Sequence, residues 1–421
     1  MGRAGSRSSG RSIFPGASGD AAGADWAALS PGIESAASSS ARNRREFTIG
    51  ESSGFAGPGG KRLQRGRRAR LRHNPADPPS AGGRKNRAVN SAPAQNGSSS
   101  SDAGYERAVR DVYAAAAAEP DASLCCVAGT AWQLPGLDVP PILHEMNYGC
   151  GSTVHPSDLA GDAPILYVGV GGGLEALQFA YFRRRKGGVI AVDPVAEMRE
   201  AAARNLEEAA RRNAWFRPEF VQILEGSADA LPVADGSAGV VAQNCLFNVF
   251  VEGDLTRALA EVYRALAPGG KFSTSDPITT EPLPEALRRN HTLRARCVSG
   301  CIGYEEYLQA LEAAGFGQLI VRARHPYRLL TPQEHPELDH AILLESLEVL
   351  AVKAASKHGR AEVFSGRTAI FTGRGHAPIE GATFASGMPM PVSDRMARDL
   401  AARGDFRVTP PTYYARAAGC C

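Results

Sequence analysis

The sequence of 421 residues has no long hydrophobic run and few cysteines. No stretch reaches the roughly 18 apolar residues that suggest a bilayer-spanning helix, so we expect no membrane partner. No secretory hydrophobic segment opens the chain, and its eight cysteines are too few for a disulfide scaffold. The absence of any CxxC pair excludes zinc-ribbon spacing. Together these absences predict free thiols in a reducing compartment.

Acidic residues are scarce near the N-terminus. Residues 1–100 contain 16 Lys and Arg against 6 Asp and Glu, which leaves 31 basic and 38 acidic residues for the rest of the chain. A mildly acidic body predicts no nucleic-acid partner, because phosphate binding depends on clustered positive charge. The tail is rich in Ser, Gly, Ala and Arg and has few large apolar side chains, so we expect it to be disordered.

The composition of this tail suits an organellar transit peptide, which is rich in Arg and Ser and poor in acidic residues. Three other interpretations stay open: a nuclear or nucleic-acid tag at residues 61–72, myristoylation at the opening MGRAGS, and a tail without a targeting role. We therefore predict a location in the chloroplast or the cytoplasm. We also expect residues 1–100 to be dispensable for activity.

The body of the chain alternates between strand-like and helix-like segments. Strands are predicted at 164–173, 187–193, 220–226, 239–247, 271–278 and 318–330, and helices at 105–118, 174–182, 195–213, 255–270 and 304–316. Helices between strands imply parallel crossovers, so we predict an α/β fold with a doubly wound, Rossmann-like sheet. A helix near 338–354 and short strands such as 368–373 follow.

Three glycines connect the first predicted strand to its helix, namely Gly169, Gly171 and Gly173 in the pattern GxGxG. Glycine there lets backbone N–H groups approach a ligand and opens the helix N-terminus toward it. The second predicted strand ends in Asp193, where a carboxylate can accept both hydroxyls of a ribose. The alternative role of Asp193 is to cap the following helix. The pattern favours a cofactor that contains a nucleoside.

Three cysteines are predicted to lie near the same edge of the sheet. Cys245 follows the fourth strand at its carboxyl end, where an open parallel sheet has its ligand crevice. Cys150 and Cys297 lie in connections that can cover this crevice. Three converging thiolates suit a thiophilic pyramidal ion, whereas zinc prefers a closed tetrahedral site. The alternative is that each cysteine packs as a small buried hydrophobe.

Longer motifs resemble S-adenosylmethionine-dependent methyltransferases. The GxGxG spacing, EGSADALPVADGSAGVV (225–241) and LTRALAEVYRALAPGGKF (255–272) match patterns of that family. The resemblance implies S-adenosyl-L-methionine as cofactor, no metal cofactor, and a binding set of Gly169, Gly171, Gly173, Asp193, Ser227, Ala228 and Asn244. In the family the pair at Ser227 and Ala228 meets the adenine, and Asp229 is a partner for its amino group. Tyr167 departs from the pattern, because many members have an acidic residue there.

The cysteine motifs narrow the resemblance. HEMNYGCG (144–151), AQNCLFN (242–248) and CVSGC (297–301) resemble arsenite S-adenosylmethionine methyltransferases, and the terminal GCC resembles the branch involved in arsenosugar biosynthesis. This resemblance implies Cys150, Cys245 and Cys297 as catalytic arsenic ligands, with Cys125 and Cys126 as auxiliary thiols. Cys301 is expected only to pack. Cys420 and Cys421 either capture arsenic or belong to a disordered end.

The resemblance implies methylation of trivalent arsenic, with arsenite and methylarsenite as substrates and a thiol reductant such as glutathione or thioredoxin as partner. Detoxification and arsenosugar biosynthesis are the implied roles. The predicted organisation is a tail at 1–104, a cap with the thiol segment at 105–160, a methyltransferase domain at 161–330 and a smaller α+β domain at 331–421. Two rivals stay open: a methyltransferase with another small acceptor, using His144 or His155 as base, and a non-catalytic metalloid-binding thiol protein.

Overall fold

A computed structural model describes residues 100–125, 134–159, 161–354 and 360–412. The predicted tail lies outside these residues, except that its last positions begin helix α1 (Ser100–Ala118). Cys126, Cys420 and Cys421 also lie outside the described residues. Within the described ranges, no helix is both long enough and apolar enough to span a membrane.

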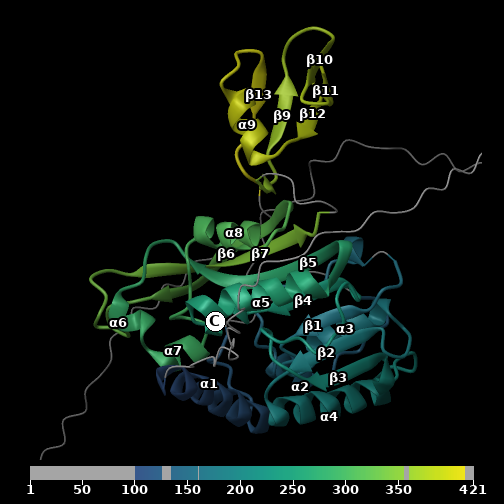
Figure 1. Ribbon diagram of the computed structural model, residues 1–421, viewed down its shortest axis with the longest axis vertical. Helices are drawn as coiled ribbons and strands as arrows, with labels where there is room; N and C mark the ends of the chain where they lie inside the picture. Colours follow the sequence, from purple (N-terminus) through teal and green to yellow (C-terminus); the bar gives the residue numbers. More distant parts are fainter. Residues whose placement is uncertain (1–99, 126–133, 160, 355–359, 413–421) are drawn as a thin grey trace, which may run out of the picture. The chain divides into compact units, whose positions relative to one another are not determined.

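An eight-stranded sheet forms the centre of the fold (Figure 1), in the order β3-β2-β1-β4-β5-β7-β6-β8. Its first five strands pair in parallel, and β7 runs antiparallel to both β5 and β6. The predicted α/β, Rossmann-like class is confirmed, with an antiparallel strand added. The strands are β1 (Ile165–Val168), β2 (Val189–Asp193), β3 (Val221–Glu225), β4 (Ala238–Asn244), β5 (Leu266–Thr279), β6 (Gln318–Leu330), β7 (Ile342–Val352) and β8 (Glu362–Phe364).

Helices cover both faces of this sheet. Because successive side chains of a strand point to opposite faces, Ile165 of β1 joins the core beneath α3 and α4, whereas Leu166 joins the core beneath α5 and α8. Burial on both faces explains why these strands are nearly continuous apolar runs. The helices are α2 (Pro141–Glu145), α3 (Leu174–Phe182), α4 (Ala196–Arg212), α5 (Glu252–Ala265), α6 (Glu285–Arg288), α7 (His291–Ala295) and α8 (Tyr304–Ala313), with short 3-10 turns at Pro156–Asp158, Pro218–Phe220 and Phe247–Val249.

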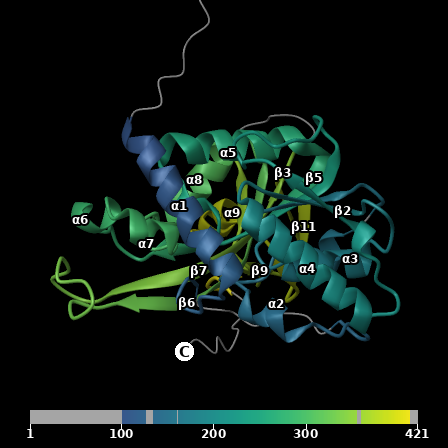
Figure 2. The same cartoon turned by 90° about the horizontal axis from the view of Figure 1, so that it is seen from below.

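Helix α1 crosses the molecule beside the carboxyl ends of the parallel strands. It packs against α4 on one side and α7 on the other, as Figure 2 shows. Two of its residues that face inward, Tyr105 and Ala116, are almost completely buried, with exposed fractions of 5% and 2%. The helix therefore forms a wall over the edge of the sheet where the candidate site lies.

Two sequence predictions about elements are wrong. The segment near 338–354 is not a helix, because Ile342–Val352 forms β7 in the middle of the sheet. A strand buried on both faces has a continuous apolar run that periodicity cannot distinguish from a buried helix. The helix predicted to reach residue 270 ends at Ala265, because Pro268 lacks an N–H group and Gly269 adopts a φ of +73°.

The C-terminal part of the described chain has a small core of its own. Phe371, Phe384 and Leu400 are at its centre. Since β7 and β8 belong to the large sheet, the boundary predicted after residue 330 cuts through that sheet. We therefore propose that the smaller α+β unit begins after β8. Its elements are β9 (Thr368–Phe371), β10 (His376–Ile379), β11 (Ala382–Ala385), β12 (Pro389–Pro391), α9 (Asp394–Ala401) and β13 (Phe406–Val408).

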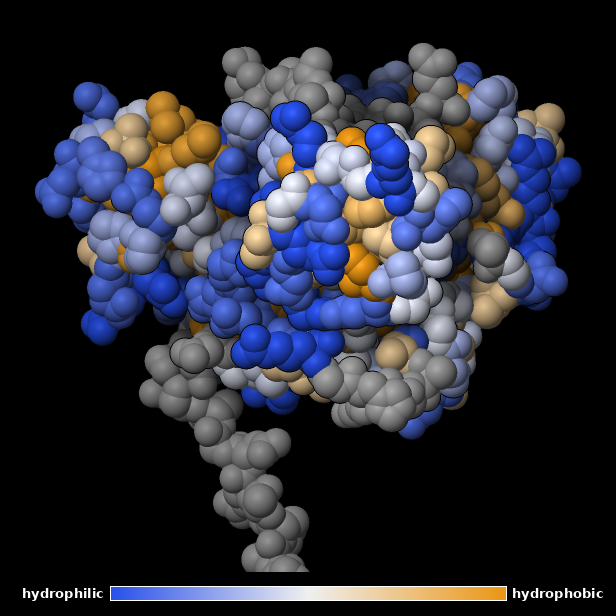
Figure 3. Space-filling model, turned by 90° about the horizontal axis from the view of Figure 1, so that it is seen from above, coloured by the Kyte–Doolittle hydropathy of each residue, from blue (hydrophilic) through white to orange (hydrophobic). Residues whose placement is uncertain are grey.

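One face of the molecule (Figure 3) is mainly polar. Hydrophilic residues dominate the face drawn in Figure 3, and hydrophobic residues appear there in small groups. Among the described residues, the large hydrophobic side chains with an exposed surface are Leu329 and Met388. Single exposed apolar side chains are normal in globular proteins, so these two do not by themselves indicate a binding surface.

Candidate functional site

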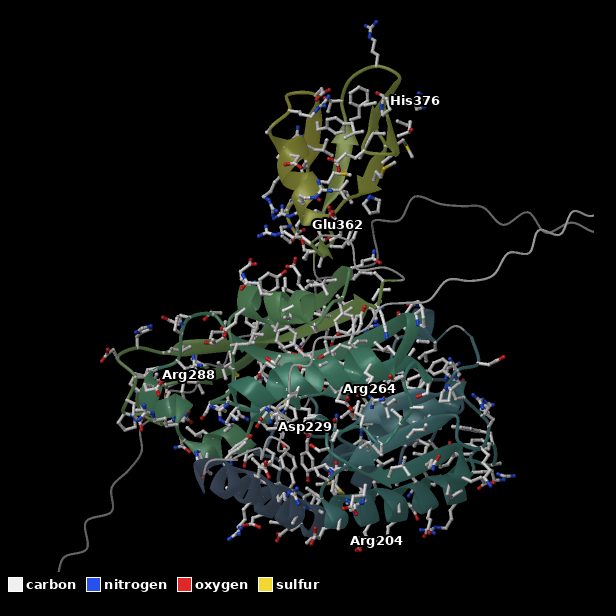
Figure 4. The ribbon with its side chains drawn as sticks, viewed as in Figure 1. Arg204, Asp229, Arg264, Arg288, Glu362 and His376 are labelled. Carbon is white, nitrogen blue, oxygen red and sulfur yellow. The ribbon has the colours of Figure 1, made fainter. Side chains whose placement is uncertain are left out.

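A cavity of about 360 Å³ lies where the parallel strands end. Its volume is within the range of small-molecule sites, roughly 300–1,000 Å³. Ends of β1 to β4 form one side, and α1 forms the other through Tyr105, Glu106, Val109, Arg110 and Tyr113. Asp229, which Figure 4 labels, lines it beyond the end of β3. The cavity thus occupies the crevice where open α/β sheets bind ligands.

Most of the predicted cofactor residues line this cavity. Gly169 and Gly171 adopt φ angles of +81° and +51°, which glycine tolerates best, and they leave the wall free of side chains. Gly173 is not in the lining; it has a φ of +98° and caps α3. The predicted residues that do line the cavity are Gly169, Gly171, Asp193, Ser227, Ala228 and Asn244. A glycine turn beside an acidic strand end fits the cofactor predicted from the sequence.

Asp193 has a structural role in addition to its place in the cavity. One carboxylate oxygen accepts a hydrogen bond from the Val170 N–H at 3.0 Å, and the other accepts one from the Val195 N–H at 2.9 Å. Burial raises its pKa to about 6, although these backbone N–H groups oppose the rise. Asp193 thus ties the glycine turn to Val195, but the capping role considered for it is wrong, because Val195 is at the N-cap of α4 and that helix has no side-chain cap.

Replacing Asp193 by alanine should weaken cofactor binding by about 1–3 kcal/mol, the range for losing a hydrogen bond to a charged group. Affinity for S-adenosylhomocysteine, measured by calorimetry, checks this. In the wild type the same affinity should decrease as the pH falls through about 6, because the protonated carboxyl is a poorer acceptor. Unchanged affinity in a folded Asp193→Ala protein would remove Asp193 from the binding set.

Four cysteine thiols converge beside the cavity. The Sγ atoms of Cys125 and Cys245 are 2.9 Å apart. Cys245 also interacts with the thiols of Cys150 and Cys297, and its own side chain lines the cavity. All four cysteines are 97% or more buried. The structure thus brings together the three predicted arsenic ligands, and it adds Cys125, which the sequence analysis treats as auxiliary.

Two of these cysteines have an unusual backbone conformation. Cys245 has a φ of +60° and Cys297 a φ of +55°, and among the described residues Glu380 is the other non-glycine residue with a positive φ. A left-handed residue with a Cβ atom costs about 1–2 kcal/mol. Such outliers gather at functional sites, where the surrounding structure enforces them. The strain distinguishes these cysteines from thiols that only fill space.

The thiol set has an uneven proton distribution. Hydrogen bonds from Cys125 and Cys245 lower the pKa of Cys297 to about 5, whereas burial raises the pKa of Cys125, Cys150 and Cys245. A protonated Cys297 would donate to the Cys245 carbonyl oxygen, 3.0 Å from its Sγ atom. Of the four thiols, Cys297 is therefore the one whose ionised form its neighbours favour.

This distribution predicts a thiolate absorbance that persists at pH 7 and disappears as the pH falls through about 5, because protonation removes the charge on Cys297. Ordinary cysteines titrate near a pKa of about 8.5 and contribute little at neutral pH. A pH titration of the ultraviolet absorbance checks the prediction, with Cys297→Ser as the comparison. A wild-type protein without this signal at pH 7 would show that the cluster is fully protonated.

Asn244 connects the cavity to the loop that carries Cys150. Its Oδ1 atom accepts a hydrogen bond from the Cys150 N–H at 3.0 Å, and its Nδ2 atom donates to the Gly151 carbonyl at 2.9 Å. The Ser346 hydroxyl donates to the Cys150 carbonyl at 2.9 Å. Asn244 lines the cavity as predicted, and it also fixes Cys150 beside Cys245.

Three polar residues near the thiols and the cavity are not predicted from the sequence. The Tyr327 hydroxyl lies 3.0 Å from the Cys125 Sγ atom, and the Tyr113 hydroxyl interacts with Cys297. Glu175 is buried near Tyr167, and it accepts hydrogen bonds from the Thr153 N–H at 2.8 Å and hydroxyl at 2.7 Å. Tyr113 lies in α1, Tyr327 in β6 and Glu175 in α3. No local sequence motif predicts that these three residues lie near the site.

Other predicted candidates lie outside the thiol contacts. Cys301 is buried and its Sγ atom donates to the Cys297 carbonyl at 3.3 Å, which fits the packing role expected for it. His144 is exposed on α2, and His155 is buried within 3.2 Å of the Ser152 carbonyl. Neither histidine belongs to the cavity lining. The geometry therefore gives the rival with a histidine base no support.

Comparison with known proteins identifies the domain around this cavity. A family model described as a methyltransferase domain matches residues 166–274. Arsenite methyltransferases are similar over part of the chain. That of Aquipseudomonas alcaligenes is 32% identical over 201 residues, 46% of this chain and 56% of the relative. That of Halobacterium salinarum is 31% identical over 172 residues, 41% of this chain and 42% of the relative.

The human arsenite methyltransferase is 28% identical over 172 residues, 40% of this chain and 44% of the relative. The chain thus spans about half the length of the curated relatives it matches. Among solved structures, an arsenic(III) S-adenosylmethionine methyltransferase from Chlamydomonas reinhardtii has a TM-score of 0.47 and 20% identity, covering 68% of this chain and 98% of that structure. The chain contains a methyltransferase domain, and its predicted resemblance to arsenite methyltransferases is confirmed in sequence.

Proposed function

We propose that the protein transfers a methyl group from S-adenosylmethionine to trivalent arsenic held by its thiols. The observation that carries this proposal is the convergence of Cys125, Cys150 and Cys297 on Cys245, which lines the cavity. Cys245 belongs to both the thiol set and the cavity lining, so a bound arsenic atom and a methyl donor would be neighbours. The similarity to arsenite methyltransferases supports the same substrate.

The thiols bind the substrate by ligand exchange. Each thiol that attacks arsenite forms an arsenic–sulfur bond and its proton leaves with a hydroxyl group as water. Cys297 is proposed as the first nucleophile, because its neighbouring thiols lower its pKa; its proton leaves with the displaced hydroxyl group as water. Soft thiolate ligands suit this thiophilic ion. Cys150, Cys245 and Cys297 are the proposed ligands, and the contact between Cys125 and Cys245 places a fourth thiol within reach.

The transfer step follows from this position. S-adenosylmethionine supplies an electrophilic methyl carbon and becomes S-adenosylhomocysteine when its carbon–sulfur bond breaks. The arsenic lone pair forms the new bond to carbon, so no proton moves and no general base is required. The protein aligns the two reactants. Its buried, apolar surroundings at the thiols exclude water, which favours a reaction that disperses positive charge.

Methylation raises arsenic formally from the trivalent to the pentavalent state. Return to the trivalent state takes two electrons, which two thiols supply when they form a disulfide and release their protons. We propose that Cys125 takes part in this step, since its Sγ atom touches that of Cys245. Cys126 is proposed as its auxiliary, and a soluble thiol such as glutathione or thioredoxin as the reductant that reopens the disulfide.

Arsenite binding tests the proposal before any turnover is measured. The reduced protein should bind one arsenic atom per chain without a cofactor, and pre-treatment with a thiol-alkylating reagent in denaturant should abolish binding after refolding. Zinc, which prefers four ligands in a tetrahedron, should compete poorly. A reduced, folded protein that does not retain arsenite after dialysis would contradict the proposed substrate.

Two aspects of cellular role are proposals from the sequence. Detoxification and arsenosugar biosynthesis both need methylated arsenic, and the terminal GCC motif favours the second role. The Arg- and Ser-rich residues 1–100 favour import into the chloroplast over a cytoplasmic location. A fluorescent reporter fused to residues 1–100 tests the location, and diffuse cytosolic fluorescence would reject import.

A further inference from the structure

We propose that Asp276 is a positioning residue that holds the left-handed turn at Cys245 and so aims its thiol at the arsenic site. The inference rests on the proposed function, because it assigns a role in binding arsenic. Asp276 lies in β5 next to the turn that follows β4, and its exposed fraction is 0%. Asp276 is not part of the cavity lining, and none of the four thiols is among its hydrogen-bond donors.

Asp276 stabilises the turn after β4 through one direct hydrogen bond and through the side chain of Gln243. Its Oδ1 atom accepts a hydrogen bond from the Phe247 N–H at 3.0 Å. Its Oδ2 atom accepts one from the Gln243 side-chain amide, whose own oxygen accepts the Leu246 N–H at 2.9 Å. The Cys245 N–H donates to the Ser275 carbonyl at 2.7 Å. Each of three consecutive N–H groups in the turn is therefore bonded to β5 or to Gln243.

These bonds explain how a strained backbone persists. A non-glycine residue at a φ of +60° keeps that conformation only when its surroundings enforce it. The direction of the Cys245 Cα–Cβ bond follows from that backbone angle, and with it the direction of the thiol. If the hydrogen bonds to the N–H groups of residues 246 and 247 are lost, Cys245 can relax to a negative φ. Its thiol then points away from Cys150 and Cys297.

The chemistry of Asp276 itself indicates a specific task. A buried carboxylate is costly to desolvate, and an apolar residue of similar size often stabilises a core better. Here the carboxylate has four donors, because Thr274 and Tyr307 add hydroxyl hydrogen bonds at 3.0 Å and 2.6 Å. Burial nevertheless raises its pKa to about 6. Two of the four donors link Asp276 to the turn, because the Phe247 N–H belongs to it and the Gln243 side chain accepts the Leu246 N–H.

The test uses two variants, each of which weakens the hydrogen bonds to the turn at a different residue. A matched control is compared with both. Asp276→Asn keeps the size of the side chain but replaces one acceptor oxygen by an amide that cannot accept. Gln243→Leu removes the acceptor of the Leu246 N–H. The control is Asp158→Asn, which weakens another buried carboxylate that pairs with Arg322 and Lys271 and contacts none of the thiols. All are studied as the full chain, well below their melting temperatures.

The readout is the number of sulfur neighbours of bound arsenite, from arsenic X-ray absorption, together with kcat and KM. We expect three sulfur neighbours in the wild type and in Asp158→Asn, and fewer in Asp276→Asn and Gln243→Leu. We also expect kcat/KM for arsenite to fall about tenfold in those two, a factor equal to 1.4 kcal/mol, while affinity for S-adenosylhomocysteine stays within about twofold.

Two outcomes overturn the inference and are distinguishable. If either folded variant keeps three sulfur neighbours and wild-type kcat/KM, Asp276 does not position Cys245, although the proposed function stands. If wild-type protein itself shows no sulfur around arsenic, both the inference and the proposed function fail. If one variant does not fold, the other decides between support and rejection.

Discussion

Replacing Cys245 by serine should abolish methylation of arsenite while leaving cofactor affinity nearly unchanged. Serine keeps the size of the side chain but is a poor ligand for a soft ion. Cys245 is the thiol that touches the cavity and interacts with the other three. We expect its loss to exceed the roughly 10–100-fold effect of altering a ligand's supporting partner. Cys150→Ser and Cys297→Ser should be similarly severe.

The matched control for these variants is Cys301→Ser. Cys301 is as buried as the proposed ligands, with 2% exposure, but its Sγ atom donates to the Cys297 carbonyl and accepts from the Asn248 side chain, and among the described residues it contacts no thiol. Steady-state rates with arsenite, and calorimetry with S-adenosylhomocysteine, give the comparison. We expect Cys301→Ser to retain most activity. An active Cys245→Ser protein beside an inactive Cys301→Ser protein would overturn the assignment of the ligands.

Removing helix α1 should eliminate activity, whereas removing the residues before it should not. A chain that begins at Asn96 keeps α1 whole, and a chain that begins at Glu119 lacks it. Without α1 the cavity loses one wall, and Cys297 loses its contact with Tyr113. We therefore expect wild-type kcat/KM from the first chain. From the second we expect both cofactor affinity and arsenite turnover to be lost.

Circular dichroism and thermal melting accompany these rate measurements, since the second chain also exposes apolar surface of α4 and α7. A double substitution within the intact helix, Val109→Ala with Tyr113→Phe, tests the same wall without removing it. Full activity of the chain that begins at Glu119 would show that α1 is no part of the site. A large loss in the chain that begins at Asn96 would show that the preceding residues contribute.

The sequence predicts the parallel half of the sheet well because its signals are local. The glycines after β1 need positive φ angles, and the helix at 174–182 matches α3 (Leu174–Phe182) at both ends. Fold logic then places Cys245 at the carboxyl end of β4 without knowledge of any distance. Such predictions succeed where one short segment contains both the pattern and its consequence.

The remaining features depend on contacts between distant segments. Strand β7 resembles a helix in sequence, because it is apolar on both faces. Its buried carboxylate, Glu348, accepts a hydrogen bond from the Ser152 N–H, which is far away in the chain. The place of Cys125 in the thiol set depends on Tyr327 and Cys245, both more than a hundred residues away. The hydrogen bonds of Asp276 to the turn at Cys245 likewise depend on which strands are neighbours in the sheet.

Arsenite-dependent turnover of S-adenosylmethionine, with every arsenic product identified, tests the central claim most directly. The reduced wild-type protein with a thiol reductant should form S-adenosylhomocysteine only when arsenite is present. The methyl groups found on arsenic should equal the S-adenosylhomocysteine formed, and Cys245→Ser should form neither. Turnover that is independent of arsenite, or a methyl group recovered on another acceptor, would contradict the account.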